Sequence, residues 1–209
     1  MSNSSAASAP VRDDPKGIKP RYVARQPIFD RDEKVFGYEL LFRDDMENVF
    51  HGGDADDASR STLDSSLLVG LDVLCDGRRA FLNCTRNTLI GGLVTLLPSR
   101  STVVEILETV PVDAEVTNAC QRLKEAGYLI VLDDYVGDDP REPLAEMADI
   151  LKGDMKLTTL KPRAALVKKH GPWRCRMLAE KVENHAEFVA ARDQGLFISR
   201  AIFCAARKS

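Results

Sequence analysis

Residues 129–134 read Leu-Ile-Val-Leu-Asp-Asp, a short apolar run that ends in two carboxylates. Such a continuous apolar run is typical of a strand in a parallel sheet, because helices cover both faces of that sheet. Similar apolar runs, each ending in acids and followed by a helical stretch, recur along the chain, with the acids at Glu39, Glu105, Glu108, Asp154, Glu180 and Glu183. We expect these acids to gather where parallel strands end, at the carboxyl-terminal mouth of a βα barrel.

Strand-like and helical patterns alternate along the rest of the chain. Strands are predicted at 23–29, 35–42, 80–83, 102–107, 128–134, 149–154, 176–180 and 196–205. Helices are predicted at 57–75, in a run ending at 97, and at 113–126, 144–147, 160–170 and 184–194. A charged turn at 30–33 joins the first two strands into a hairpin. The predicted fold class is therefore α/β, a TIM-like (βα)8 barrel with an N-terminal β-hairpin.

Composition limits the class of protein. The chain has 209 residues, 44% hydrophobic and 29% charged, which suits one domain with one core. Residues 1–20 are rich in Ser, Ala, Pro and Asp, so we expect a disordered segment ahead of a barrel domain at 21–209. Without an apolar stretch of signal-peptide or membrane-span length, we expect a soluble, cytoplasmic protein with no membrane partner. Five scattered cysteines argue against a disulfide framework or zinc, and a net charge of −3 argues against general nucleic-acid binding.

Two stretches near the N-terminus resemble a known family. Residues 26–30 read Gln-Pro-Ile-Phe-Asp, and residues 38–43 carry an E-x-L-x-R signature at Glu39, Leu41 and Arg43. This opening resembles that of EAL domains, a bacterial phosphodiesterase family acting on cyclic di-GMP. The resemblance continues through 81–83, 104–108, 132–135, 149–154 and 179–183, and is closest to the EAL halves of EAL-HDOD signalling proteins. Motifs in this order are far more specific than a lone signature.

The resemblance implies a site for two divalent cations, Mg²⁺ or Mn²⁺, which prefer oxygen ligands. It assigns one cation to Glu39, Asn83, Glu105 and Asp133, and the second to Asp134 with Glu183. If the domain is active, Lys152 orients the attacking water and Glu183 shares in catalysis. Gln26, Leu41 and Arg43 contact the nucleotide, and the guanidinium of Arg43 suits a phosphate.

The segment after Asp134 departs from the family pattern. EAL domains usually carry Phe-Gly-Thr-Gly-Tyr-Ser-Ser there, which shapes the second metal site and a dimer contact, whereas residues 135–141 read Tyr-Val-Gly-Asp-Asp-Pro-Arg. Leu107 also replaces the Thr of the preceding Glu-x-Thr-Glu motif. Both changes favour a domain that does not cleave its nucleotide.

The last strand can be aligned in two ways with the family's Gln-Gly-Tyr motif, whose Gln lies near the metals. Without gaps, Arg200 takes the place of that Gln, and its guanidinium would compete with a metal ion for the acids. The other alignment uses Gln194 but deletes about two helical turns from the preceding helix. We favour Arg200, because that alignment preserves the element lengths.

Three functions stay open from the sequence. We favour a degenerate cyclic di-GMP signalling domain that binds a protein partner, cyclic di-GMP or both, and that requires Mg²⁺ or Mn²⁺ only if it is active. The alternatives are an active Mg²⁺- or Mn²⁺-dependent phosphodiesterase that yields linear pGpG, and a pure nucleotide receptor. A homodimer is also left open. Because acids at strand ends often cap helices or brace loops, Glu108, Asp154 and Glu180 are not assigned to the site.

Overall fold

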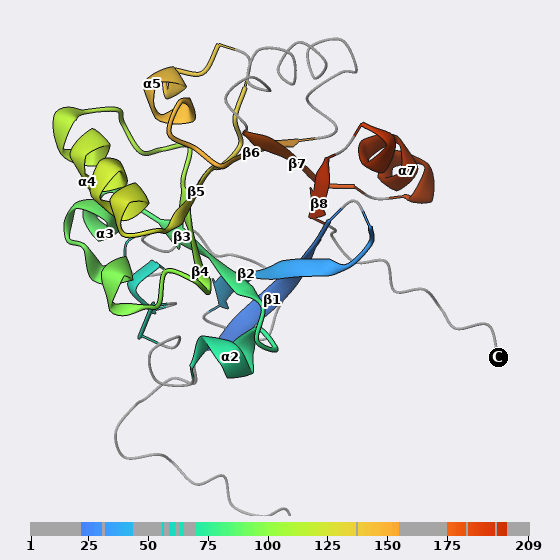
Figure 1. Ribbon diagram of the computed structural model, residues 1–209, viewed down its shortest axis with the longest axis horizontal. Coiled ribbons are helices and arrows are strands. Elements are labelled where there is room, and N and C mark those ends of the chain that lie inside the picture. The colour runs from blue at the N-terminus through green and yellow to red at the C-terminus, as the bar shows by residue number, and fades with distance from the viewer. Residues whose placement is uncertain are drawn as a thin grey trace, which may run out of the picture.

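The computed structural model describes residues 22–30, 32–43, 56, 59–61, 63–64, 70–136, 138–154, 175–182, 184–194 and 196–199. Over these residues the strands close into a barrel in chain order, from β1 to β8 (Figure 1). The strands are β1 Tyr22–Phe29, β2 Val35–Arg43, β3 Arg79–Cys84, β4 Thr102–Ile106, β5 Leu129–Leu132, β6 Ile150–Asp154, β7 Arg176–Glu180 and β8 Phe197–Ser199. The helices are α2 Leu71–Leu74, α3 Arg86–Ile90, the 3₁₀ helix η1 Leu93–Leu96, α4 Ala114–Glu125, α5 Glu142–Ala145 and α7 His185–Asp193.

The β1–β2 hairpin is part of the barrel wall. β1 runs antiparallel to both of its neighbours, β2 and β8, whereas all other neighbouring strands are parallel. The Asp30 carboxylate stabilises the hairpin turn by accepting hydrogen bonds from the N–H groups of Asp32 and Lys34 at 2.9 and 3.0 Å. The predicted α/β barrel with its N-terminal hairpin is confirmed.

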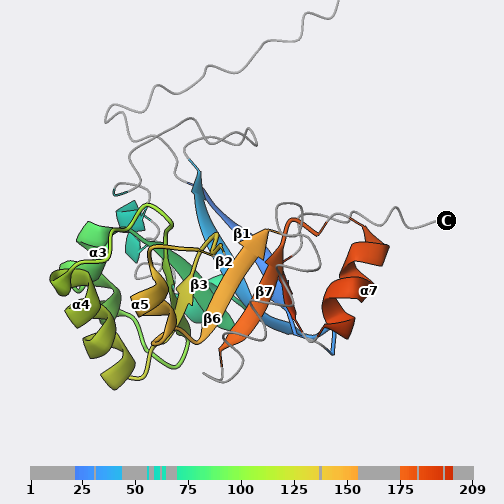
Figure 2. The same cartoon turned by 90° about the horizontal axis from the view of Figure 1, so that it is seen from above.

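Helices pack on the outside of the barrel. Figures 1 and 2 place α3, α4 and α5 on one side of it and α7 on the opposite side. In α4, the buried residues Val116, Ala119, Cys120 and Leu123 follow helical spacing and form the face turned to the strands. Asp113 caps this helix by accepting a hydrogen bond from the Val116 N–H at 2.8 Å.

The barrel interior begins with an apolar layer. Its buried members, one from each of six strands, are Ile28, Phe81, Val103, Val131, Ile150 and Leu178. Gly37 makes room for this layer, because an added Cβ would lie 2.6 Å from the Arg79 carbonyl oxygen and 2.8 Å from the Phe81 ring. The intervening strand residues, such as Leu82 and Val104, belong to the larger core that also contains the buried helix residues.

Three element predictions need correction. The helix predicted at 57–75 is interrupted at Gly70, whose φ of 89° is not helical, and α2 begins after it. The helical run ending at 97 is split into α3 and η1, because Gly92 adopts a left-handed conformation (φ 67°) between them. The short helix predicted at 144–147 lies at Glu142–Ala145, with Pro143 in its first turn, where proline is tolerated.

Other predictions fall outside the described residues: the disordered segment 1–20, the helix 160–170 and the end of the last strand. None of the described helices is both long and apolar enough to cross a membrane.

Candidate functional site

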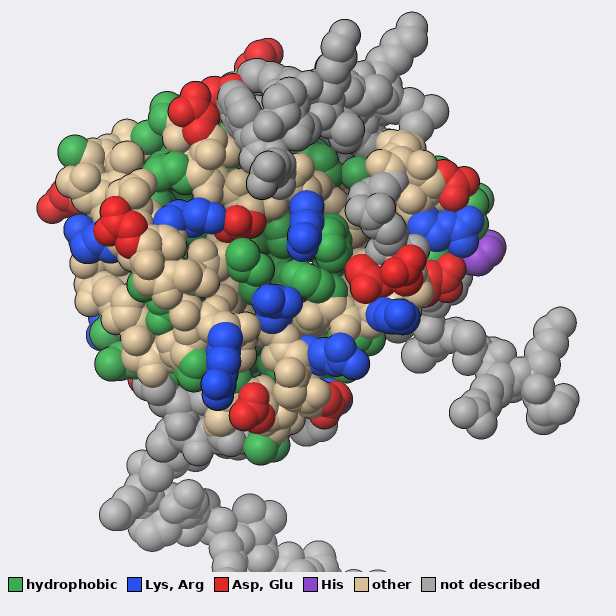
Figure 3. All heavy atoms as spheres, viewed as in Figure 1, with side chains coloured by type: hydrophobic (Ala, Val, Ile, Leu, Met, Phe, Trp, Pro, Cys, Tyr) green, Lys and Arg blue, Asp and Glu red, His purple; other side chains and the backbone are tan. Residues whose placement is uncertain are grey.

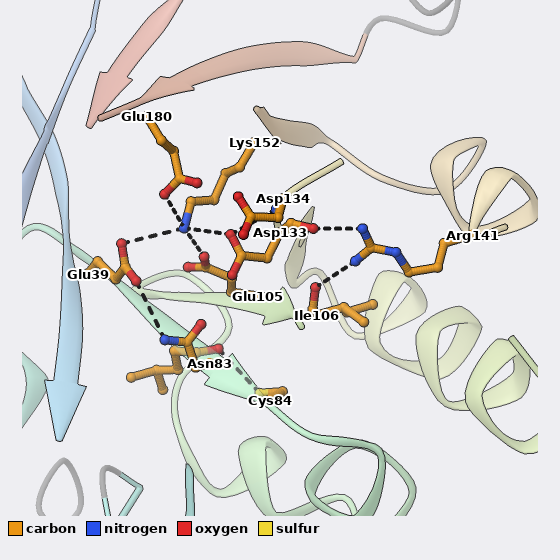
Figure 4. A network of polar contacts seen from close by, with 11 residues as sticks. Glu39, Asn83, Cys84, Glu105, Ile106, Asp133, Asp134, Arg141, Lys152 and Glu180 are labelled. Carbon is orange, nitrogen blue, oxygen red and sulfur yellow. Dashed lines mark hydrogen bonds and ion pairs between the residues drawn. The ribbon is translucent and has the colours of Figure 1, made fainter. Parts of the chain in front are cut away.

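Polar side chains replace the apolar layer at the carboxyl ends of the strands (Figure 4). Asn83, Glu105, Asp133, Lys152 and Glu180 each lie two residues beyond a member of the apolar layer. Because side chains alternate across a strand, residues two apart share one face, so these five project into the barrel. Glu39 on β2 joins them, two residues beyond Gly37. Residues scattered from 39 to 180 in the sequence therefore meet at one mouth of the barrel.

Lys152 lies at the centre of the acids. Its side chain is 1% exposed, and its Nζ lies 2.9 Å from Glu180 Oε1, 3.0 Å from Asp133 Oδ1 and 3.5 Å from Glu39 Oε2. Nζ also forms an ion pair with Glu105 Oε1. One ammonium group thus faces four carboxylates, and the cluster carries an excess of negative charge.

The surroundings of these groups shift their pKa values. Burial raises the pKa of Glu105 well above its usual range, and the nearby Glu39 carboxylate raises it further. Burial also raises the pKa of Glu180 to about 7. For Lys152, burial acts to lower the pKa, but the four carboxylates outweigh it and raise the pKa well above normal. The cluster therefore holds Lys152 as a cation and favours protons on Glu105 and Glu180, which is the electrostatic setting of a cation site.

Two buried oxygen atoms indicate which kind of ligand the acidic cluster can bind. Among the described residues, Asn83 Oδ1 and Glu105 Oε2 have no hydrogen-bond partner. The Asn83 amide nitrogen donates to Glu39 Oε1 at 3.5 Å. Because unsatisfied buried oxygens are costly, they are best explained by a ligand that they can coordinate. A hard divalent cation such as Mg²⁺ or Mn²⁺ accepts this donor set of carboxylate and amide oxygens.

A second group of oxygens lies beside the first. One carboxylate oxygen from each of Asp133, Asp134 and Glu180 lies within 4.8 Å of the others. Asp134 adopts a left-handed backbone conformation (φ 43°), uncommon for a residue with a side chain, and its N–H donates to Asp133 Oδ1 at 3.1 Å. Outliers of this kind concentrate at functional sites, where the surrounding structure maintains them.

The segment that replaces the family loop is tightly held. Arg141 is 2% exposed, and its guanidinium donates to the carbonyl oxygens of Asp133 at 2.7 Å and Ile106 at 3.4 Å. The Tyr135 N–H donates to the Lys152 carbonyl at 2.7 Å, and the Tyr135 hydroxyl donates to Glu142 at 2.8 Å. The segment that replaces the Gly-Thr-Gly loop thus forms its own hydrogen bonds to the strand ends.

The proposed nucleotide contacts lie on the β1–β2 hairpin. Gln26 is directly opposite Glu39 in the strand register, so the two share a face of the sheet. Leu41 follows Glu39 at the next alternate position of β2, so these two residues share a face of the strand, and Arg43 is the last residue of β2. The structure places Gln26 and Leu41 on the strand face that carries Glu39, and the contacts of Gln26, Leu41 and Arg43 with a nucleotide stay predictions.

Most of the other predicted site residues converge at the acidic mouth. Glu39, Asn83, Glu105, Asp133, Asp134 and Lys152 come together, while Glu183 and Arg200 lie outside the described residues. Gln194 is exposed at the end of α7, and β8 begins after it at the strand end opposite the acids. The alignment that placed Gln194 among the acids is therefore wrong, because the helix extends to the residue before it.

The sequence interpretation assigned neither Glu180 nor Arg141 to the site. Glu180 was expected among the acids at the strand ends, but it was set aside as a potential loop brace; in the structure it contacts Lys152. Arg141 carried no signal in the sequence, because the groups through which it reaches the site are the backbone carbonyls of Ile106 and Asp133.

Comparisons with known proteins agree with this geometry. No family model matches the chain. It is 36% identical over 188 residues to the uncharacterized protein YuxH of Bacillus subtilis, and 37% identical over 187 residues to the cyclic di-GMP phosphodiesterase CdgJ of Vibrio cholerae. The alignments cover 87% of this chain but only 46% of YuxH and 43% of CdgJ, so the chain spans less than half the length of either relative.

A solved structure extends the comparison to the fold. YkuI of Bacillus subtilis, a protein with an EAL domain that was crystallised with its substrate c-di-GMP and calcium, matches with a TM-score of 0.68 and 18% identity. The match covers 88% of this chain and 56% of YkuI. This chain has the EAL-domain fold. The resemblance to EAL domains seen in the sequence is thereby confirmed.

Proposed function

We propose that this chain is a cyclic di-GMP signalling domain that binds the nucleotide at its acidic barrel mouth together with a divalent cation. The observation that carries this proposal is the convergence of Glu39, Asn83, Glu105 and Asp133, with two buried oxygens that lack a partner among the described residues. The likeness to CdgJ and YkuI supports the choice of nucleotide.

The residues of the site would divide the work of binding. Glu39, Asn83, Glu105 and Asp133 would hold the cation, which when bound offsets phosphate charge and lowers the pKa of a coordinated water. Lys152 stays protonated among the acids, so its ammonium group can hold a phosphate oxygen or that water by a charge-assisted hydrogen bond. Gln26 and Leu41, on the hairpin beside Glu39, would line the nucleotide's path.

Calorimetric titration of cyclic di-GMP, with Mn²⁺ and with EDTA, tests the proposal. We expect binding to be tighter with Mn²⁺, and Glu105→Gln to remove that gain. Glu108→Gln is the matched control, because Glu108 lies exposed in the turn after the same strand. Binding that is absent in both conditions, or that Glu105→Gln leaves intact, contradicts the proposal.

Hydrolysis of cyclic di-GMP to pGpG is the second candidate function. The three clustered oxygens of Asp133, Asp134 and Glu180 favour it, because a second cation there would complete a two-metal site. The replaced loop and Leu107 favour binding without cleavage. We expect turnover with Mn²⁺ far below about 1 s⁻¹, the lower end for typical enzymes. Chromatographic detection of pGpG at or above that rate would establish the enzyme instead.

A protein partner and a homodimer, both implied by the family resemblance, stay predictions. Size-exclusion chromatography with light scattering, with and without cyclic di-GMP, tests the homodimer directly.

A further inference from the structure

Arg141 and Asp139 form a buried pair in the segment that replaces the family loop. Each side chain is 3% exposed. Arg141 Nε donates to Asp139 Oδ1 at 2.9 Å and Nη2 to Oδ2 at 2.7 Å, while the Arg141 N–H donates to Oδ1 at 2.8 Å. Such a bidentate pair orients the planar guanidinium, because both of its partner oxygens belong to one carboxylate.

The oriented guanidinium reaches two strand ends of the barrel (Figure 4). Nη2 donates to the Asp133 carbonyl at 2.7 Å, and Nη1 donates to the Ile106 carbonyl at 3.4 Å. The Ile106 carbonyl also accepts the Asp133 N–H at 3.0 Å. Ile106 directly follows Glu105, so both carbonyls belong to backbone that carries a proposed cation ligand.

These contacts bear on the geometry of the acids. The Asp133 carbonyl belongs to the peptide that leads into Asp134, whose backbone is in the left-handed region. Holding that carbonyl restrains this peptide, and with it the directions of both aspartate side chains. Since Asp139 balances the charge of Arg141, the effect on the acids comes through the backbone rather than through an added positive field.

We propose that Arg141, oriented by Asp139, is a positioning residue that holds Asp133, Asp134 and Glu105 in the arrangement that binds a divalent cation. This inference rests on the proposed function of the acidic mouth. It gives this chain a substitute for the Gly-Thr-Gly loop, built from a side chain instead of a backbone turn. Groups of this kind, behind the metal ligands, typically change metal affinity by about 10–100-fold when removed.

The test measures Mn²⁺ binding to the full chain by calorimetry, with the Mn²⁺ electron paramagnetic resonance spectrum as a second readout. Arg141→Gln should weaken Mn²⁺ binding about tenfold or more and alter the spectrum. Arg141→Lys should recover part of the affinity, because an ammonium group can still donate to one of the carbonyls. Tyr135→Phe is the matched control: it removes the hydroxyl bond to Glu142 from the same segment but leaves the Asp133 and Ile106 carbonyl contacts in place.

Thermal unfolding in EDTA separates positioning from stability. The proposal expects Tyr135→Phe to keep wild-type Mn²⁺ affinity even if its melting temperature falls as far as that of Arg141→Gln. It is overturned if Arg141→Gln binds Mn²⁺ as the wild type does, or if affinity falls equally in the two variants. If Arg141→Gln does not fold, Asp139→Asn replaces it and should weaken binding in the same direction.

Mn²⁺ binding by the wild type distinguishes the cation site from the positioning role of Arg141. Wild-type protein that binds no Mn²⁺ refutes the proposed cation site, and the inference with it. Wild-type binding that survives Arg141→Gln refutes only the inference.

Discussion

The two layers inside the barrel use the same strands for opposite purposes. On β3 the apolar layer has Phe81 and the polar layer has Asn83; on β7 the corresponding residues are Leu178 and Glu180. The apolar layer is almost fully buried and makes ordinary packing contacts, whereas the polar layer places four carboxylates around one lysine. Stability and function are therefore separated by two residues along each strand, and neighbouring substitutions can test them independently.

The opposite mouth of the barrel has a different chemistry. Phe36 and Phe197, at the starts of their strands, pack against the apolar layer, and the guanidinium groups of Arg79 and Arg176 lie 5.1 and 5.4 Å from these rings. Figure 3 shows a face on which lysine and arginine side chains surround central hydrophobic ones. Cation–π contacts at such exposed positions stabilise by roughly 0.5–1 kcal/mol each. This mouth closes the core, while the acidic mouth carries the unsatisfied oxygens of Asn83 and Glu105.

Phe81→Ala gives the largest expected effect on the apolar layer. It empties the space that the ring fills beside Gly37, so the free energy of unfolding should fall by about 3–5 kcal/mol. The Mn²⁺ affinity of the folded protein should not change. Urea denaturation and calorimetry measure the two quantities, and a loss of metal affinity without a loss of stability would contradict the separation of layers.

The polar layer should make the metal-free protein less stable as the pH rises. Burial raises the pKa of Glu180 from the ordinary 4.5 to about 7, so the folded state binds this proton more tightly than the unfolded state does. The resulting stability is complete below about pH 4.5 and is lost as the pH rises through about 7, a loss on the order of 3 kcal/mol.

Urea denaturation in EDTA across this pH range measures that loss. Glu180→Gln should flatten the pH dependence of the unfolding free energy. Leu178→Ala, two residues earlier on β7, should lower the unfolding free energy at every pH without changing its slope against pH. An unfolding free energy that rises with pH in the wild type, or one that falls equally in Glu180→Gln, would contradict the role given to Glu180.

Gly37→Ala tests how tightly the apolar layer is packed against β2. The added methyl group would lie 2.6 Å from the Arg79 carbonyl oxygen, a backbone atom that cannot move away easily. We expect overpacking to cost about 1–3 kcal/mol of unfolding free energy. Gly153→Ala is the control, because its nearest contact would be 3.8 Å away, and equal losses in the two variants would argue against steric crowding at Gly37.

Asn83→Ala should give the smallest effect, and only on binding. It removes one neutral oxygen ligand, so Mn²⁺ affinity should fall about tenfold, which corresponds to about 1.4 kcal/mol. Stability in EDTA should change little, because the deleted Oδ1 has no partner among the described residues and the amide nitrogen makes a long hydrogen bond, 3.5 Å, to Glu39. Calorimetry that finds full Mn²⁺ affinity in this variant would exclude Asn83 as a ligand.

The sequence by itself determined the order of strands and helices and most of the acidic mouth. An apolar strand ending in acid is a local pattern that predicted where the acids gather, and the resemblance to EAL domains selected Glu39, Glu105, Asp133 and Asp134 among them. Parallel strands in a barrel direct their carboxyl ends to one mouth, so the convergence of these acids follows from the topology alone.

Only the tertiary structure decided how the site is closed and braced. Lys152 meets Glu39 across 113 residues of sequence, and Arg141 meets the Ile106 carbonyl across 35. The sequence pattern does not specify which carboxylates surround one ammonium group, which oxygens lack partners, or which carbonyls a guanidinium reaches. Those contacts depend on the curvature of the closed sheet and on backbone atoms, which are the same for every residue type and leave no mark in the sequence.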